Sequence, residues 1–331
     1  MANQNNSTIS IYLGKACNLR CFWCYDQANI CESVDFSKFI RFYNDIIKDH
    51  FNNIILIGGE PLVYPQLFDV LNLLCDKNVI IVSNGIQLSN LDCYNQISKF
   101  SNVSISLSIK GYNEHSFYFT TNKDCFNDLS KALSLLSTSN IRVSYSYVYD
   151  SLIKADDYES FLQFCNNHSI KQITIGEIRP YVNDEGHVVN SSNNKLQFEQ
   201  FITYLIRNGI DVIAKIQSPL CEYSCEFIDG LLKNKRLLTM CSVKRGGALV
   251  FNSNLDLILC DACHDICLGY YEKDFYNYDS LKDLFFSKGI RKVYNLFSGC
   301  PYQKCLDCEK WIICGGGCVL NWRKNGNKNK E

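Results

Sequence analysis

The chain carries the segment Cys17-Asn18-Leu19-Arg20-Cys21-Phe22-Trp23-Cys24 directly after a predicted strand at Thr8–Leu13. Its three cysteines follow the spacing C-x3-C-x2-C. Three thiolates in one loop suit a 4Fe–4S cluster, which normally takes four cysteine ligands. The iron that receives no protein ligand can then bind a small molecule, as catalytic metals do at an open position. The alternatives are an incomplete zinc knuckle and a redox C-x2-C of a thioredoxin-like fold; the third cysteine and the position at a strand end weigh against both.

The length and composition narrow the class of protein. The chain has 331 residues, a formal net charge of −1, 47% hydrophobic residues and 20% charged residues. At about 100–200 residues per domain, this length predicts two domains. A net charge near zero removes the broad electrostatic argument for nucleic acid or an anionic membrane as the main partner. The unusual feature is the nineteen cysteines.

The compartment decides between disulfides and metal ligation for these cysteines. The N-terminal residues show no basic region followed by an apolar run, so no signal peptide is expected. No stretch approaches about 18 consecutive apolar residues, so a membrane span is not expected either. We therefore expect a cytoplasmic protein, and structural disulfides are rare in that reducing compartment. Metal or cluster ligation is the favoured explanation.

Strands and helices alternate over the first 215 residues. Runs rich in Val, Ile, Tyr and Ser predict six strands, at Thr8–Leu13, Asn53–Ile57, Val79–Ser83, Val103–Ser108, Arg142–Tyr149 and Gln172–Ile175. Helical periods lie between them, for example at Phe36–Ile47, Gln66–Cys75, Cys125–Leu136 and Asp157–Cys165. This alternation predicts βαβ units and a parallel sheet. An open barrel and a doubly wound sheet both satisfy the pattern.

The pattern changes in the second half of the chain. A polar segment at 183–194 precedes an amphipathic helix near Lys195–Arg207, and eleven cysteines follow Pro219. Gly246–Phe251 and Leu255–Cys260 predict a β-hairpin, and Tyr278–Phe297 predicts a helix. We expect a first domain at 1–215, a bridging segment at 216–240, a cysteine-rich domain at 241–322 and a disordered Lys/Asn-rich tail at 323–331.

Glycine and polar side chains follow the second, third and fourth predicted strands. Gly58-Gly59-Glu60-Pro61 ends the second strand, and glycines there let the backbone approach a ligand while Glu60 offers a carboxylate to a cation. Taken alone, this is as consistent with an ordinary βα turn. Ser83 and Asn84 end the third strand, and Ser106 lies in the fourth. In parallel βα barrels the active site lies at the C-terminal ends of the strands, where these residues fall.

Together, the C-x3-C-x2-C loop and the Gly58–Glu60 segment resemble the radical S-adenosylmethionine (SAM) enzymes. That resemblance implies a partial (β/α)6 barrel, which agrees with the six predicted strands. It implies a 4Fe–4S cluster held by Cys17, Cys21 and Cys24, with the aromatic Trp23 before the third cysteine. The open iron of that cluster would bind the amino and carboxylate groups of SAM.

The same resemblance assigns further SAM contacts. It implies that Gly58, Gly59 and Glu60 bind the SAM ammonium. Ser83, Asn84 and Ser106 would contact the SAM ribose and carboxylate, although Ser106 can also simply pack inside the barrel. Relatives often have an arginine after the fourth strand that pairs with the SAM carboxylate, whereas this chain has no arginine between Ser108 and Arg142. Arg179 could pair with the carboxylate or form an ordinary surface ion pair, and Glu177 is a further catalytic candidate.

A second group of cysteines follows C-x2-C-x5-C-x3-C spacing at Cys305, Cys308, Cys314 and Cys318. Four thiols within fourteen residues suit a metal, and zinc would accept the spacing equally well. The string closely resembles the SPASM domain of radical SAM proteins, which carries one or two auxiliary 4Fe–4S clusters. Cys241 and Cys260 match the upstream half of that domain, although Leu255 replaces its usual glycine.

The SPASM resemblance implies two ligand sets. Cys241, Cys260 and Cys318 would hold the first auxiliary cluster, and Cys305, Cys308 and Cys314 the second. Each set lacks one ligand. The hypothesis from the sequence is that Cys300 completes the second cluster and that Cys225 or Cys263 completes the first. Cys31, Cys75, Cys93, Cys125 and Cys165 are expected to be plain core or loop cysteines.

The resemblance implies reductive cleavage of SAM to a 5′-deoxyadenosyl radical, which abstracts hydrogen from a substrate C–H bond. SPASM proteins act mostly on ribosomally made peptides, so we expect a precursor-peptide substrate modified by a thioether or carbon–carbon crosslink, oxidation or epimerisation. The alternatives are a small-molecule radical dehydrogenase or decarboxylase and a non-catalytic iron–sulfur electron carrier. Expected partners are an external one-electron reductant such as flavodoxin or ferredoxin and a separate peptide-recognition protein, because only sixteen residues precede Cys17.

Overall fold

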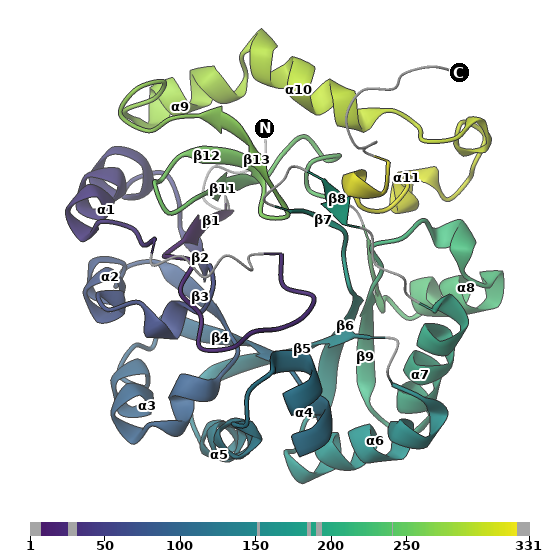
Figure 1. Cartoon of the computed structure of the whole chain (residues 1–331). Coiled ribbons are helices and arrows are strands. Elements are labelled where there is room, and N and C mark those ends of the chain that lie inside the picture. Colours follow the sequence, from purple (N-terminus) through teal and green to yellow (C-terminus); the bar gives the residue numbers. More distant parts are fainter. Residues whose placement is uncertain are drawn as a thin grey trace.

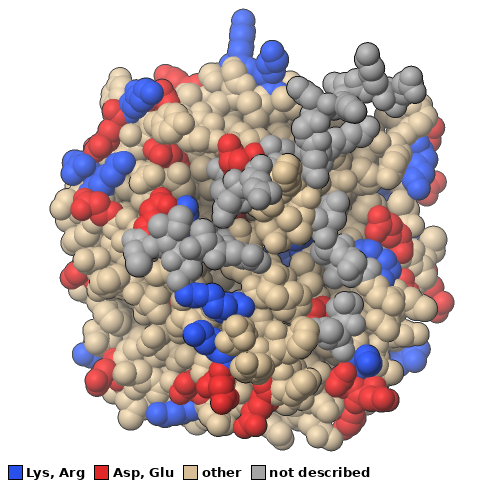
Figure 2. Space-filling model, in the orientation of Figure 1, with Lys and Arg blue, Asp and Glu red and all other residues tan. Residues whose placement is uncertain are grey.

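The computed structural model describes residues 8–25, 32–150, 153–183, 187–189, 194–239 and 241–322. The predicted tail at 323–331, Cys31 and most of the polar segment at 183–194 lie outside these residues. Most of the described strands form one curved sheet surrounded by helices (Figure 1). Charges of both signs are scattered over the face shown in Figure 2, with no field of a single sign across it.

One eleven-stranded sheet runs through the described chain in the order β10-β9-β6-β5-β4-β3-β2-β1-β11-β12-β13. Its parallel part comprises β1 (Thr8–Tyr12), β2 (Asn53–Ile57), β3 (Asn78–Ser83), β4 (Val103–Ile109), β5 (Arg142–Tyr149), β6 (Gln172–Glu177), β9 (Asp211–Lys215) and β10 (Leu237–Leu238). β11 (Leu249–Phe251) pairs with β1 in parallel, and β12 (Leu257–Cys260) and β13 (Cys263–Gly269) follow in antiparallel. A separate small ribbon joins β7 (Tyr181–Val182) to β8 (Val188–Val189).

Helices cover the outer surface of the parallel sheet. They are α1 (Phe36–Phe42), which continues as a π-helix at Tyr43–Ile47, α2 (Leu67–Leu73), α3 (Leu91–Ile97), α4 (Glu114–Thr121), α5 (Phe126–Ser137), α6 (Tyr158–Asn167), α7 (Lys195–Arg207) and α8 (Cys225–Lys233). The C-terminal part contributes α9 (Tyr278–Phe285), α10 (Lys288–Ser298) and the short α11 (Trp311–Cys314). The α5 helix illustrates why they pack, because its buried residues Leu129, Ala132, Leu133 and Leu136 recur at helical spacing.

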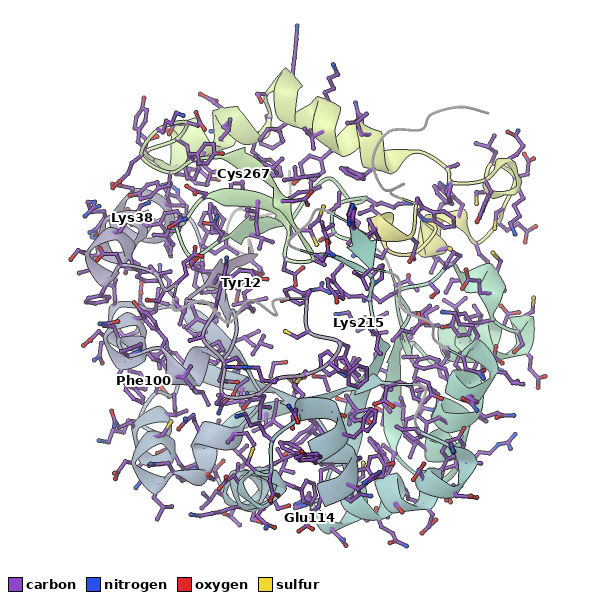
Figure 3. All side chains as sticks on the ribbon, viewed as in Figure 1. Tyr12, Lys38, Phe100, Glu114, Lys215 and Cys267 are labelled. Carbon is purple, nitrogen blue, oxygen red and sulfur yellow. The ribbon has the colours of Figure 1, made fainter. Side chains whose placement is uncertain are left out.

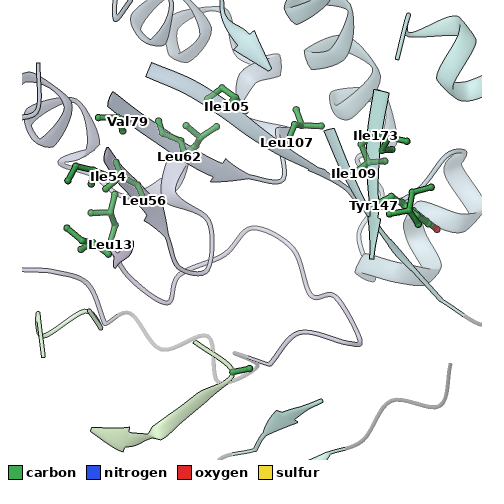
Figure 4. Packing of buried hydrophobic residues seen from close by; sticks show 14 of the residues in the cluster. Leu13, Ile54, Leu56, Leu62, Val79, Ile105, Leu107, Ile109, Tyr147 and Ile173 are labelled. Atoms are coloured by element: carbon green, nitrogen blue, oxygen red, sulfur yellow. The ribbon is translucent and has the colours of Figure 1, made fainter. Parts of the chain in front are cut away.

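The strand pattern separates the two faces of the sheet. In β4 the residues Val103, Ile105, Leu107 and Ile109 are buried, whereas the alternate serines are half-buried. Side chains alternate between the faces of a strand, so the apolar set packs under the helices and the serines face the interior. Figure 4 shows this apolar layer continuing through Ile54, Val79 and Ile173 of neighbouring strands. The main core therefore lies between sheet and helices, which leaves the interior face for polar groups.

The predicted α/β fold with a partial barrel and a C-terminal hairpin and helix is confirmed. The predicted number of parallel strands, six, was too low, because β9 also pairs with β6 in parallel and extends the sheet. The prediction of a single helix at Tyr278–Phe297 was wrong, because α9 ends at Phe285 and a second helix, α10, begins at Lys288. The Ser287 hydroxyl caps α10 by accepting a hydrogen bond from the Ile290 amide. A side-chain cap of this kind favours a new helix start over an uninterrupted helix.

Candidate active site

The C-x3-C-x2-C loop follows β1 and lies across the carboxyl ends of the parallel strands (Figure 1). Two backbone bonds fix it to the end of α4, from Arg20 N to Thr121 O at 3.0 Å and from Phe22 N to Thr120 O at 3.1 Å. The Lys110 ammonium, just after β4, lies 4.5 Å from the centre of the Trp23 ring. The loop is thus positioned by both the backbone and a cation–π contact.

The three cysteine side chains of this loop are half-buried and close enough to influence one another. Burial raises the pKa of Cys17 to about 11, and the neighbouring Glu60, Cys21 and Cys24 add to the rise, while the Leu19 amide donating to its Sγ opposes it. A cation or a metal is needed to hold such thiols as thiolates near neutral pH. The Nε1 of Trp23 is buried and has no hydrogen-bond partner among the described residues.

Glu60 joins the loop to the ends of β2 and β3. Its buried carboxylate accepts hydrogen bonds from Ser83 Oγ at 2.7 Å, Asn84 N at 2.7 Å and Leu62 N at 3.1 Å. The Asn84 side chain in turn donates from Nδ2 to Asn18 Oδ1 at 2.8 Å. Burial raises the pKa of Glu60, and these donors oppose the rise. The network brings together four of the residues predicted from separate motifs, Cys17 included.

The two glycines before Glu60 serve a different contact from the one predicted. A Cβ at Gly58, where φ is +139°, would lie 2.3 Å from Gly14 O, and one at Gly59 would lie 2.4 Å from Ala16 O. Gly59 N and Glu60 N donate to Gly14 O and Ala16 O, each at 2.9 Å. The glycines therefore let the end of β2 approach the start of the cysteine loop, which the sequence pattern alone did not indicate.

Ser106 lies on the interior face of β4 and is half-buried. In the sheet register it neighbours Val82 of β3 and Ser144 of β5, and Ser108 neighbours Ser146. β4 and β5 thus present hydroxyls side by side toward the interior. This row offers hydrogen-bond donors and acceptors to a polar ligand.

Arg179 forms a bidentate ion pair with Asp261, with Nη1 to Oδ1 at 2.9 Å and Nη2 to Oδ2 at 2.6 Å. Its guanidinium lies 4.7 Å from the centre of the Tyr25 ring, and Tyr25 Oη accepts from Tyr12 Oη at 3.0 Å. Burial opposes the charge of Asp261, but Arg179 outweighs it and holds the pKa of Asp261 well below its usual range. Tyr12 and Lys215 mark opposite sides of this interior region in Figure 3.

Glu177, at the end of β6, has its carboxylate occupied by protein donors. Lys195 Nζ and Ser218 Oγ donate to Oε1, and Gln217 N and Ser218 N donate to Oε2 at 2.8 and 2.9 Å. The Glu177 side chain is 0% exposed. Gln217 O also accepts from Cys318 N at 2.7 Å. This arrangement suits a residue that positions the 217–218 segment and, through it, Cys318.

Two members of the first predicted auxiliary set lie near Tyr294, and the third lies near one of them. Cys241 and Cys260 both lie close enough to raise the pKa of this tyrosine, which burial brings to about 12. Burial also raises the pKa of Cys318 to about 11, and Cys241 contributes to that rise. The Tyr294 Oη is buried and has no hydrogen-bond partner among the described residues. Cys241 and Cys260 thus lie near this unsatisfied buried hydroxyl, and Cys318 lies near Cys241; such a hydroxyl can donate to a group that accepts a hydrogen bond.

The second predicted set meets Lys244 and the turn before α8. Cys314 Sγ accepts from Leu220 N and Gly316 N, each at 3.3 Å. Lys244 donates to Gly315 O and lies within electrostatic range of Cys241, Cys300, Cys305 and Cys314. Gly315, Gly316 and Gly317 all have positive φ angles, between 53° and 76°. The tight turn between Cys314 and Cys318 therefore depends on glycine.

Two of the proposed completing ligands lie apart from one another. Cys263 is buried beside Cys260, at the connection between β12 and β13, and its Sγ lies 3.4 Å from Asp265 Oδ1. Cys225 begins α8, on the side of Cys308. None of the described cysteines forms a disulfide. Among the described side chains, no three His, Cys, Asp or Glu residues form a group that could hold a single metal ion.

A hollow on the described surface holds none of these residues. It has a volume of about 410 Å³ and lies between α7 and α8, lined by Glu199, Arg207, Phe227 and Arg236 among others. In the described part of the chain, no helix has both the length and the apolar character needed to span a membrane.

Comparison with known proteins agrees with this geometry. Residues 11–165 match the family model of the radical SAM superfamily. A GTP 3′,8-cyclase of Chlorobaculum tepidum is 26% identical over 184 residues, which cover 52% of this chain and 54% of that protein. The chain thus spans about half the length of this curated relative.

Solved structures of the same fold cover nearly the whole chain. SuiB of Streptococcus suis bound to S-adenosylmethionine has a TM-score of 0.68 and 15% identity, covering 96% of this chain and 74% of that one. The anSMEcpe structure with bound AdoMet also has a TM-score of 0.68 and 15% identity, covering 94% and 89%. Both proteins also have structures with peptides, SuiB with its precursor peptide SuiA and anSMEcpe with the Cp18Cys peptide. At these identities the similarity is one of fold.

Proposed function

Because residues 11–165 match the family model of the radical SAM superfamily, we propose that this protein is a radical SAM enzyme, which cleaves SAM reductively and abstracts hydrogen from a C–H bond of a ribosomally made peptide. Its cytoplasmic setting, an external one-electron reductant and a separate peptide-recognition protein are parts of the same proposal. The radical SAM part comprises residues 1–215, and segment 216–240 joins it to a SPASM-like part at 241–322.

The observation that carries the proposal is the Glu60 network. Glu60 holds Ser83 and Asn84, and Asn84 holds Asn18 beside Cys17, so the ends of β2 and β3 and the cysteine loop form one polar unit. An ionised carboxylate can accept about four hydrogen bonds, and Glu60 accepts three from the protein. One acceptor position therefore remains for a cation such as the SAM ammonium, which would favour the ionised form of this buried group.

The residues of the loop fit a 4Fe–4S cluster. Cys17, Cys21 and Cys24 would hold it, and the unsatisfied Trp23 Nε1 offers a donor beside it. When bound, the cluster supplies the electron that cleaves SAM to methionine and a 5′-deoxyadenosyl radical. The protein orients SAM through Glu60 and through the hydroxyls of the interior face, Ser106 among them. The loop lies across the strand ends, where it would shield bound SAM from water (Figure 1).

The SPASM-like part would hold auxiliary clusters. Cys241 and Cys260 lie near Tyr294, whose unsatisfied hydroxyl can donate to a cluster sulfur, and Cys318 lies near Cys241. A net oxidation such as a thioether or carbon–carbon crosslink requires an electron acceptor, and auxiliary clusters provide one. Arg179, held by Asp261, lies between this set and Tyr25 of the cysteine loop. It therefore borders both sites rather than standing free to pair with the SAM carboxylate.

A peptide substrate is supported by the kinds of protein that share the fold. SuiB and anSMEcpe are both described in complex with peptides, and the match to each spans more than nine-tenths of this chain. The test is anaerobic reduction of the reconstituted protein with SAM and a co-expressed candidate peptide. We expect 5′-deoxyadenosine, and a peptide mass lowered by about 2 Da for a crosslink or unchanged for epimerisation.

Glu60→Gln tests the site itself. We expect at least a tenfold loss of 5′-deoxyadenosine formation, with Glu222→Gln on the exposed surface as the matched control. Cluster content of both variants is measured by iron analysis, so a lost cluster is not mistaken for lost SAM binding. Absence of 5′-deoxyadenosine from the fully loaded wild-type protein would end the enzyme proposal and favour an electron carrier.

A small-molecule substrate is the second candidate. The GTP 3′,8-cyclase of Chlorobaculum tepidum aligns over 52% of this chain. Incubating the reduced protein with SAM and GTP discriminates the two functions. GTP consumption with 5′-deoxyadenosine formation in the absence of peptide would favour the small-molecule function.

A further inference from the structure

The turn before α8 lies directly against the second cysteine string. Leu220 N donates to Cys314 Sγ at 3.3 Å, and Lys310 Nζ contacts Asp229 Oδ1 of α8 at 2.7 Å. Cys314 N also donates to Lys310 O at 2.8 Å, which keeps Lys310 on the same compact loop as the cysteines. Contacts at both ends of segment 220–229 therefore fix α8 beside the loop at 305–314.

Cys225 is on the side of α8 that faces this loop. It precedes Asp229 by four residues, and residues four apart share one face of a helix. Asp229 contacts Lys310, which is two residues after Cys308. Cys225 and Cys308 both lie within electrostatic range of the same Lys310 ammonium. The Cys225 thiol of α8 and the Cys308 thiol of the loop at 305–314 therefore both lie near the Lys310 ammonium.

The environment of Cys225 suits a thiolate ligand. It is the first residue of α8, a nine-residue helix capped by Ser224. Cys225 and Cys308 are both exposed, although free cysteines are usually among the most buried residues. Binding of both thiols to a cluster would bury the sulfur atoms that are exposed in the structure without it.

We propose that Cys225 is the fourth ligand of the second auxiliary 4Fe–4S cluster, together with Cys305, Cys308 and Cys314. The cluster then fastens α8 of the barrel to the C-terminal loop. This inference rests on the proposed function, since it requires that auxiliary clusters are present. It replaces the assignment from the sequence, in which Cys225 completes the first cluster and Cys300 the second.

The ligand is tested in a variant without the SAM cluster, carrying Cys17→Ala, Cys21→Ala and Cys24→Ala. Two auxiliary clusters correspond to about eight irons per chain. Adding Cys225→Ala is expected to halve the iron and sulfide content or to produce the electron paramagnetic resonance signal of a three-iron cluster. Cys221→Ala, four residues earlier, and Cys93→Ala in α3 are the controls and should leave both measurements unchanged.

A measurement without further substitution covers the case in which the Cys225→Ala chain does not fold. In the reconstituted wild-type protein, iodoacetamide should modify Cys221 and spare Cys225, and removal of iron by a chelator should make Cys225 reactive. Full iron content with Cys225→Ala, or labelling of Cys225 in the loaded protein, would overturn the assignment. A parent variant without iron would instead overturn the auxiliary clusters of the proposed function, and this inference with them.

Discussion

Glu177→Gln distinguishes a positioning role from the catalytic role that the sequence suggested for this residue. The side chain of Glu177 is fully buried and receives hydrogen bonds from Lys195, Gln217 and Ser218. A glutamine can keep its oxygen toward the two backbone amides of 217 and 218. The NH2 group of the new glutamine must then face Lys195 and the Ser218 hydroxyl, both of which donate hydrogen bonds to Oε1 of Glu177 in the wild type.

The expected cost follows from those two bonds. Each hydrogen bond to a charged group contributes about 1.5–3 kcal/mol, so losing both costs about 3–6 kcal/mol. Part of this is recovered, because the amide can donate to Ser218 and Lys195 can turn toward Glu222, whose carboxylate lies 3.6 Å from Nζ. We expect a net loss of about 3 kcal/mol in the free energy of unfolding, in line with the breaking of a buried ion pair.

The assay is denaturant unfolding of the cluster-free chain under reducing conditions. Glu222→Gln is the control, because its exposed side chain should change stability by less than about 0.5 kcal/mol. Combining Glu177→Gln with Lys195→Met should cost less than the sum of the two single changes, since both remove the same pair. Unchanged stability together with lost SAM cleavage would refute the positioning role and restore Glu177 as a chemical group.

Three further outcomes are expected. Gly58→Ala should lower the free energy of unfolding by about 3 kcal/mol, because φ is +139° and the new Cβ would meet a backbone oxygen, whereas Gly209→Ala, with open space around it, should cost about 1 kcal/mol; equal costs would contradict the close approach. Asp261→Asn should lower the free energy of unfolding at pH 7. Because Arg179 lowers the pKa of Asp261, the difference in this free energy between variant and wild type should shrink as the pH falls below 3.8, the usual pKa of an aspartate. Unfolding curves across pH measure this difference, and a constant difference would argue against the ion pair. In the cluster-free chain at pH 8, iodoacetamide should modify exposed Cys75 well before buried Cys165, whose pKa burial raises to about 12. Mass spectrometry measures the order of modification, and modification of Cys165 first would contradict this prediction.

Local patterns in the sequence predicted the parallel part of the fold well. The strands at Asn53–Ile57 and Arg142–Tyr149 and the helix at Lys195–Arg207 agree with the structure in their bounds. Each has a strong periodicity of its own, which is a local property. By contrast, the sequence pattern did not predict β9, which extends the sheet by pairing with β6, a segment distant along the chain.

The candidate site, too, was predicted from the sequence only in part. The spacing of Cys17, Cys21 and Cys24 identified the loop, because ligands within eight residues are close in any fold. The role of Gly58 was missed, since its contact with Gly14 joins segments that are distant along the chain. Arg179 and Asp261 are 82 residues apart, and no motif links them. Their pairing could be found only in three dimensions.

The sequence by itself determined the chemistry that each short segment can perform, because residue type and spacing set which ligands a loop offers. The tertiary structure decided which segments act together. It enclosed Glu177 among protein donors, and it brought Cys225 of α8 and Cys308 of the C-terminal loop near the same Lys310. The physical reason is that such contacts depend on how strands and helices pack against one another, which the spacing of residues within one segment does not specify.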